Sequence, residues 1–365
     1  MKKHLALCLI LVLLAGMLSA CGQTPPPAET PAAAETPAVT EAPAPTETPA
    51  ATEAPLPSES PAETAEPGPA PTPETPDFDP EELHPLLWEL SDSEGHKLYL
   101  FGTIHVGDGR NPLVLEKLSP ILLGCDALAV EFDLVAYEKD LAAVMADYQQ
   151  FVYTDGSTVR DHMPEELYAR CSALLTEAKA YSPLLDYYNL GMWSQLTETA
   201  ALLTGSSLDP NYAMDRLLIL RAYEQELPVL DVESAAFQMG ILNSFPDELN
   251  LLLIENTLDN LESYGESVDT LYSAWLTGDY DGLLACLFSD EEGSEDLSEE
   301  QLALIEDYNR AMIDDRNLGM AETALGYLRS GDTVFFAVGA GHMVGDKGLV
   351  QLLRDAGCTV ERIEY

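Results

Sequence analysis

Two histidines occur in the same sequence pattern at distant points of the chain. His105 follows Gly102-Thr-Ile, and His342 follows Gly339-Ala-Gly. Each Gly-x-x-His motif comes directly after a short apolar run with the composition of a buried strand. Glycine permits a sharp turn at a strand end, and open α/β sheets bind ligands beyond the carboxyl ends of their strands. The motifs therefore predict that the two imidazoles face one site.

Two glutamates end apolar segments in a similar way. Glu131 follows an apolar run within 126–132, and Glu233 ends the run at 227–233. Two imidazoles and one or two carboxylates can hold a divalent ion with open coordination positions. Water on such an ion becomes a nucleophile near neutral pH, and a spare carboxylate can accept its proton. A structural role for each histidine stays open, and Glu233 could instead cap a helix at 234–238.

The elements that have to position these residues follow a mixed pattern. Strand, helix and strand within about 35 residues form a βαβ unit, so the first two strands are predicted to be parallel. The predicted fold class is α/β, a mixed α+β domain with parallel βαβ elements and a large helical insertion. Strands are predicted at 98–101, 126–132, 227–233, 333–338 and 359–363, and helices at 112–123, 137–148, 164–180, 183–203, 212–225, 235–242, 246–264, 268–277, 280–287, 298–330 and 347–356.

The first 21 residues have the pattern of a secretory signal. Lys2 and Lys3 precede an apolar run at 5–14, which is too short to span a bilayer. Leu18-Ser-Ala-Cys21 then has the form of a lipobox, in which the cysteine is lipidated and becomes the new N-terminus. A plain secretory signal could also end in Ser-Ala, but the cysteine directly after it favours a lipoprotein. We expect an extracytoplasmic protein that is anchored to the cell membrane through lipid on Cys21.

Residues 22–77 have the composition of a disordered linker. They hold 16 of the chain's 25 prolines, and no Lys or Arg occurs between Lys3 and Lys97. Such a segment cannot bury enough apolar surface to offset its ordering entropy, and proline keeps it extended. We predict a stalk at 22–77 and one globular domain at 78–365.

Charge and cysteine spacing exclude several functions. The chain carries 63 acidic residues against 17 Lys and Arg, a formal net charge of −46, which disfavours a nucleic-acid partner. The cysteines at 125, 171, 286 and 358 form no Cys-x-x-Cys pair, so a zinc finger is excluded. An extracytoplasmic location would allow disulfides among them without requiring any. The acidic stretch at 289–300 lacks the alternating ligands of a calcium loop.

Six segments, taken in chain order, resemble the successive motifs of the TraB/PrgY/GumN family, whose superfamily includes the animal Tiki proteases. They are 98–108, 129–132, 215–238, 274–279, 316–321 and 338–345. The chain departs from the family pattern at 231–234, where Leu-Glu-Thr is more common, although Glu233 is kept. The family's signature of two Gly-x-x-His motifs, a Glu and an Arg-Asn pair falls on His105, His342, Glu131, Arg316 and Asn317, with the motif glycines Gly102, Gly339, Gly341 and Gly345.

The resemblance implies a metal-dependent hydrolase that acts on peptides. Tiki members cleave peptides with manganese or cobalt, and some bacterial members act on peptide pheromones. We therefore expect a divalent ion, Mn, Co or Zn, as cofactor and a peptide as partner. The expected metal ligands are His105, His342, Glu131 and Glu233, and the expected catalytic residues are Glu131, Arg316 and Asn317.

The expected roles of the Arg-Asn pair follow from their donor groups. Arg316 would position a substrate carbonyl or carboxylate through its planar guanidinium, and Asn317 would donate to an oxyanion or hold a ligand. The rival interpretation is a non-catalytic surface lipoprotein that binds or sequesters a peptide or pheromone. A purely structural surface protein would leave the paired motifs unexplained.

Overall fold

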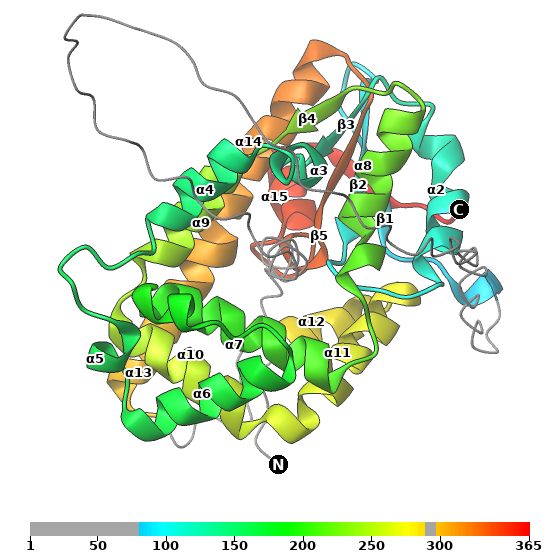
Figure 1. Cartoon of the computed structure of the whole chain (residues 1–365). Coiled ribbons are helices and arrows are strands. Elements are labelled where there is room, and N and C mark those ends of the chain that lie inside the picture. Colours follow the sequence, from blue (N-terminus) through cyan, green and yellow to red (C-terminus); the bar gives the residue numbers. More distant parts are fainter. Residues whose placement is uncertain (1–79, 289–296) are drawn as a thin grey trace, which may run out of the picture. The chain divides into compact units, whose positions relative to one another are not determined.

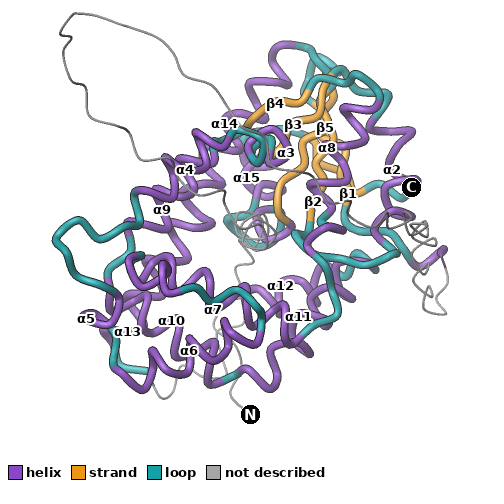
Figure 2. The backbone as a smooth tube through the Cα atoms, in the orientation of Figure 1, coloured by secondary structure: helices purple, strands orange, loops and turns teal. Residues whose placement is uncertain are grey.

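A computed structural model describes residues 80–288 and 297–365 of the chain. The predicted signal at 1–21, the predicted linker at 22–77 and most of the acidic stretch at 289–300 lie outside the described residues. The described part forms one α/β domain with a six-stranded mixed sheet, which confirms the predicted fold class (Figures 1 and 2).

The sheet has the strand order β4-β3-β5-β2-β1-β6. The four strands β4, β3, β5 and β2 run parallel to one another, whereas β1 is antiparallel to both β2 and β6. The predicted parallel pair is β2 and β3, but these strands are not neighbours because β5 lies between them. The strands are β1 (Leu87–Ser91), β2 (Lys97–Thr103), β3 (Ala127–Val130), β4 (Val229–Asp231), β5 (Val334–Gly339) and β6 (Thr359–Arg362).

Burial explains why β5 takes the central place among the parallel strands. The five residues from Val334 to Val338 are all buried, as expected for a strand covered on both faces. Phe335 packs on Phe101 of β2 with ring centroids 5.9 Å apart. The strand that leads to His342 is thereby held next to the strand that leads to His105.

Helices cover the sheet on both sides. Figures 1 and 2 show α2 (Asn111–Leu122) and α8 (Met214–Glu224) on one side, with α14 (Asp315–Ser330) and α15 (Leu349–Asp355) on the other. Helix α8 contacts β3 and β4, and α14 contacts β2 and β5. These contacts bring Asp215, at the start of α8, and Arg316, at the start of α14, to the sheet.

The predicted helical insertion forms a lobe below the sheet in Figure 1. Helix α7 packs against α6, α10 and α11, and its Trp193 is fully buried. The helices of this lobe are α5 (Val159–His162), α6 (Glu165–Glu177), α7 (Leu190–Gly205), α10 (Asp247–Asp259), α11 (Leu261–Leu276), α12 (Tyr280–Phe288) and α13 (Glu299–Asn309). Three more helices lie higher in this view: α3 (Leu134–Tyr137), α4 (Leu141–Gln149) and α9 (Ala235–Ser244).

Several predicted helices differ from the observed ones. The helix predicted at 183–203 is a 3₁₀ turn at Pro183–Tyr187 followed by α7, and the one predicted at 246–264 divides into α10 and α11. The helix predicted at 137–148 begins only at Leu141, as α4, because the Asp140 side chain caps its N-terminus, whereas Tyr137 ends the separate short helix α3. The helix predicted at 298–330 contains a π-helical turn at Arg310–Asp314 between α13 and α14. Turns of this kind are frequent at functional sites.

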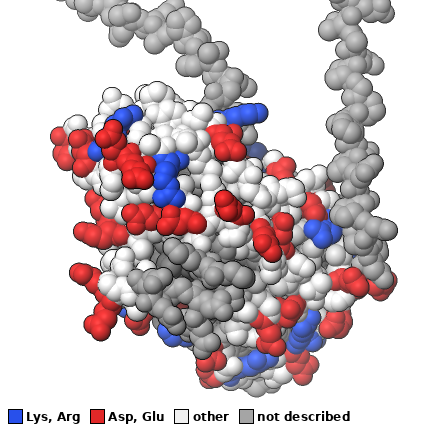
Figure 3. All heavy atoms as spheres, turned by 90° about the horizontal axis from the view of Figure 1, so that it is seen from below, with Lys and Arg blue, Asp and Glu red and all other residues white. Residues whose placement is uncertain are grey.

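Three further features concern the surface, the cysteines and membranes. Acidic side chains spread over the face shown in Figure 3, with fewer basic ones between them. The four cysteines of the described part are all free thiols. None of the helices at 80–288 and 297–365 is long and apolar enough to cross a membrane.

Candidate active site

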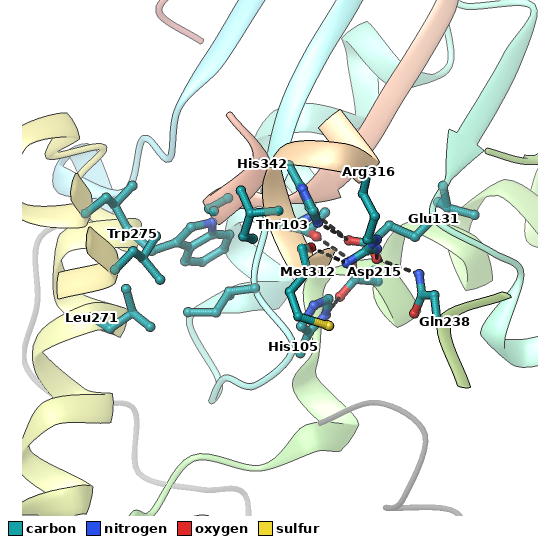
Figure 4. A pocket seen from close by; sticks show the side chains of 18 of the residues that line it. Thr103, His105, Glu131, Asp215, Gln238, Leu271, Trp275, Met312, Arg316 and His342 are labelled. Carbon is teal, nitrogen blue, oxygen red and sulfur yellow. Dashed lines mark hydrogen bonds and ion pairs between the residues drawn. The ribbon is translucent and has the colours of Figure 1, made fainter. Parts of the chain in front are cut away.

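The register of β2 and β5 brings the two Gly-x-x-His motifs together. Thr103 pairs with Gly339 at the carboxyl ends of these parallel strands. The chain then turns in both places, and the turns carry His105 and His342 over the same edge of the sheet (Figure 4). Strand β3 adjoins β5 on its other side and ends one residue before Glu131. Three expected site residues therefore meet at the ends of three adjacent strands.

Gly339 lies at the centre of this group. A Cβ placed on Gly339 would be 3.2 Å from Glu131 Oε1, 3.6 Å from His105 Nε2 and 3.7 Å from His342 Cδ2. His105 Nε2 and His342 Cδ2 both lie within 3.7 Å of this Cβ position, so these two atoms are at most twice that distance apart. Any side chain at Gly339 would crowd the three groups. At Gly102 a Cβ would lie 3.0 Å from the Ala340 Cα, so this glycine lets the second motif approach the first strand.

Each imidazole is held through its Nδ1 atom. His105 Nδ1 is 2.7 Å from Asp215 Oδ2, and His342 Nδ1 is 2.7 Å from Asn317 Oδ1. An acceptor on the Nδ1 side places a proton there and turns Nε2 toward the pocket. His342 Nε2 is 3.9 Å from Glu131 Oε1. The two Nε2 atoms and the Glu131 carboxylate thus face a common space.

The two histidines differ in charge. Burial alone would lower the pKa of His105, but the charge and hydrogen bond of Asp215 outweigh it and raise the pKa to about 9. Burial and the nearby Arg316 charge lower the pKa of His342 to about 3. At neutral pH His342 is therefore neutral, whereas an ion that binds at His105 Nε2 has to displace a proton.

A buried ion-pair cluster stands beside the histidines. The Arg316 side chain is 4% exposed, and its Nη2 donates to Glu131 Oε2 and to Glu233 Oε2, at 2.7 Å in both cases. Gln238 Nε2 donates to the same two oxygens at 2.9 Å. Burial would raise the pKa of Glu131, but the charge of Arg316 outweighs burial and holds this pKa well below its ordinary value. Glu131 is therefore an ionised carboxylate, and its Oε1 accepts the Gly339 N–H at 2.8 Å.

The geometry separates Glu233 from the other expected metal ligands. Arg316 Nε lies 3.1 Å from both oxygens of Glu233, and Arg316 Nη2 approaches Oε2 at 2.7 Å. Both carboxylate oxygens thus face the guanidinium, not the two imidazoles. Glu233 was expected to be a ligand because it ends an apolar run, but its partner is the Arg316 cation, 83 residues away in sequence.

Arg316 and Asn317 both form hydrogen bonds to other groups of the protein and hold them in place. All three nitrogens of the Arg316 guanidinium donate to protein oxygens, the third being Nη1 to the Met312 carbonyl at 3.1 Å. Asn317 is fully buried and donates to the Lys347 carbonyl while its Oδ1 contacts His342. Of the roles expected from sequence, the holding of a ligand is the one that the position of Asn317 fits.

Sequence reasoning missed two residues that orient the site. Asp215 binds His105 and also accepts a hydrogen bond from Thr103 Oγ1. Gln238 joins the two glutamates. Both lie in the segment 215–238 that carries the family resemblance, but each stands in a helix with no local signal of chemistry. Their positions depend on packing across more than 100 residues of chain, which no short motif encodes.

The chemistry of the donor set fits a divalent ion, although its spacing is wide. Within residues 80–288 and 297–365, no three His, Cys, Asp or Glu side chains are close enough to form a metal site as they stand. Two imidazole nitrogens and one carboxylate oxygen, each with an outer hydrogen-bond partner, are a common ligand set. Ligand atoms on a tetrahedral ion lie roughly 3.3 Å apart. The distance between His342 Nε2 and Glu131 Oε1, which is 3.9 Å, would have to shorten by about half an ångström for both atoms to bind one such ion.

These groups line one end of a pocket that opens to solvent at its mouth. Figure 4 shows His105, His342, Arg316 and Glu131 pointing toward one another, with Trp275 and Leu271 across from them. The rest of the lining is largely apolar. Such a pocket beside a few converging polar groups is the usual form of a small-molecule or substrate site.

Comparison with known proteins identifies the family. The model of the TraB/PrgY/gumN family matches residues 86–362, and the chain therefore belongs to that family. It is 24% identical over 323 residues to a protein named "Metalloprotease TIKI homolog" from Amphimedon queenslandica, which covers 76% of this chain and 61% of that protein. It is 26% identical over 180 residues to "Uncharacterized protein YbaP" from Escherichia coli (strain K12), which covers 49% of this chain and 63% of that protein. The chain thus spans less than two thirds of both relatives. No solved structure matches it.

Proposed function

We propose that the protein is a metal-dependent hydrolase that acts on peptides. The observation that carries the proposal is the convergence of His105 Nε2, His342 and Glu131 Oε1 around Gly339 at one end of a largely apolar pocket. Membership of the family and the likeness to the Amphimedon queenslandica protein named as a metalloprotease support it. A serine or cysteine nucleophile is not needed for this chemistry.

The residues of this site have distinct proposed roles. His105, His342 and Glu131 Oε1 would hold a Mn, Co or Zn ion, which supplies Lewis-acid polarisation of a carbonyl group when it is bound. Asp215 and Asn317 fix the imidazole rings through Nδ1. Arg316 keeps Glu131 ionised, so that this carboxylate can act as a ligand or as a proton acceptor. The apolar lining of the pocket limits the access of water.

Turnover in the presence and absence of metal tests the proposal. The full chain is purified in detergent, stripped with a chelator and reloaded with Mn, Co or Zn. We expect cleavage within a diverse peptide library by at least one metal-loaded form and none by the stripped protein. Metal uptake without cleavage of any peptide would contradict the proposal.

A binding module is the second candidate, and one observation favours it. No three acidic, histidine or cysteine side chains of the described part are close enough to form a ready metal site, and both glutamates already pair with Arg316. A protein that captures a peptide without cleaving it would need no metal ion. Tight peptide binding by the stripped protein, with no turnover in any metal, is the result that this candidate predicts.

We also propose that the protein is anchored outside the cytoplasm through lipid on Cys21. The support is the Leu18-Ser-Ala-Cys21 sequence after an apolar run. Replacement of Cys21 with Ser is expected to move the protein from the membrane fraction to the soluble fraction, because the lipid has no other attachment point. Cell fractionation with detection of the protein measures this. A Cys8→Ser variant is the control, since Cys8 lies within the predicted signal and its loss should change nothing. Unaltered membrane partition of the Cys21 variant would contradict the anchor.

A further inference from the structure

The pocket divides into two chemically different halves. One half carries the titratable cluster around Gly339. The other is lined by aliphatic and aromatic side chains from α11, α12 and the π-helical turn: Leu271, Trp275, Leu283, Leu287, Met312 and Ile313. Trp275 does not change this character, because its indole N–H already donates to the Gly102 carbonyl at 2.7 Å.

Gly341 marks the junction of the two halves. A Cβ placed on it would lie 3.7 Å from Leu287 Cδ1 and 3.8 Å from Ile313 Cδ1. The corresponding point on Gly339, two residues earlier, is surrounded by Glu131, His105 and His342. The apolar half therefore begins within one or two residues of the reacting groups. Leu287 and Ile313 would therefore lie close to the atoms next to any group that is bound at the histidines.

The apolar half is fixed to the ion-pair cluster and does not stand apart from it. The π-helical turn at Arg310–Asp314 contributes Met312 and Ile313, and the Met312 carbonyl accepts a hydrogen bond from Arg316 Nη1 at 3.1 Å. Met312 is 1% exposed, so it is packed in place. The same arginine thus positions the carboxylates and the apolar wall.

We infer that this half is a subsite for one apolar side chain of a peptide, adjacent to the bond that is cleaved. The inference rests on the proposed function, in which water adds across an amide, the C–N bond breaks, and an acid and an amine form. The side chains that line this half, as far as the structure describes it, offer no charge, so a charged substrate side chain would lose its hydration without gaining a partner. A Leu or Phe side chain would instead remove apolar surface from water on both partners.

Gly341 offers a direct way to fill the subsite. Alanine there would place its methyl group in ordinary van der Waals contact with Leu287 and Ile313, and no left-handed backbone angle opposes the change. Gly341→Ala should therefore fold and should narrow the subsite. The matched control is Gly326→Ala in α14, where an added Cβ meets nothing within 4 Å.

The test separates binding from turnover. Four blocked peptides differ at one position, Ala, Leu, Phe or Asp, and their binding to the metal-stripped full chain is measured by calorimetry. We expect the Leu and Phe peptides to bind at least about 10-fold more tightly than the Asp peptide, as is usual for apolar subsites. Gly341→Ala should weaken the binding of the Leu and Phe peptides by about 10-fold and leave the binding of the Ala peptide nearly unchanged. Gly326→Ala should alter the binding of none of the four peptides.

Two results would overturn the subsite. The first is equal binding of the Asp and Leu peptides, or no binding of any of the four. The second is an equal loss for all four peptides in Gly341→Ala, which would show a general distortion. Turnover by the metal-loaded protein is measured separately. A preference for Leu and Phe without cleavage would support the subsite and contradict the hydrolase.

Discussion

Glu131→Gln is expected to lower peptide turnover by roughly 10²–10⁴-fold, which is the usual contribution of a catalytic acid or base. The substitution keeps the size of the side chain but removes its charge. One Glu131 oxygen accepts from Arg316 and Gln238, and the other accepts from the Gly339 N–H. The amide NH₂ of Gln would replace one of these acceptors with a donor. The site therefore loses both its proton acceptor and part of its hydrogen bonding.

Metal content decides which role Glu131 has. If Glu131 is the base, the variant keeps its metal and loses turnover; if it is a ligand, metal and turnover fall together. Glu138→Gln is the matched control, because Glu138 also pairs with a partly buried arginine, Arg216, and is not among the residues that line the pocket. Unchanged metal and unchanged turnover in Glu131→Gln would make the carboxylate structural.

Arg316→Met is expected to destabilise the fold by about 3–5 kcal/mol at neutral pH, because it leaves buried carboxylates without a cation. Both partners of Arg316 are largely buried, with side chains 13% exposed at Glu131 and 8% at Glu233. The control is Arg310→Met. Arg310 pairs with Asp307, and both side chains are more than half exposed, so its loss should cost less than about 0.5 kcal/mol. Denaturant unfolding measures both variants.

The same pair of variants predicts a pH dependence. The pKa of Glu131 is lowered from its ordinary value of 4.5, so in the wild type its contribution to stability is complete above that pH and is lost as the pH falls below it. Without Arg316, ionised Glu131 no longer stabilises the fold, and protonation of this carboxylate removes an unpaired buried charge. The stability gap between the wild type and Arg316→Met should therefore narrow as the pH falls below 4.5. A gap that stays constant or widens would contradict the ion-pair account.

The central strands could be predicted from sequence because burial on both faces leaves a continuous apolar run. Strands β2, β3 and β5 each have such a run. Because the two histidine motifs follow β2 and β5 directly, the prediction that they face one site followed from these strands. Strand β1 was missed. Its place depends on antiparallel pairing with β2 and β6, which no local pattern in the sequence encodes. Short apolar runs of this kind do not distinguish a strand from other buried structure.

The site shows the same limit at the level of single residues. Motifs mark His105, His342 and Glu131 because each follows a strand whose end is encoded locally. The partners of these residues cannot be found in this way. Asp215 reaches His105 from a helix 110 residues later, and Glu233 turns to Arg316 because an arginine on α14 is packed against it. Residue type indicates which interactions a side chain can form, whereas packing decides which neighbour it contacts.

The central claim is that His105 and His342 hold one ion together. Its most direct test is the metal content of the purified full chain, measured by elemental analysis after loading with Mn, Co or Zn. The wild type should retain close to one ion per chain, and His105→Ala and His342→Ala should each lose most of it, since one of three ligands is gone. His96→Ala should keep it, because His96 bonds to Asp92 in a surface turn. An ion retained in full by both single variants, or absent from the wild type at every metal concentration, would contradict the account.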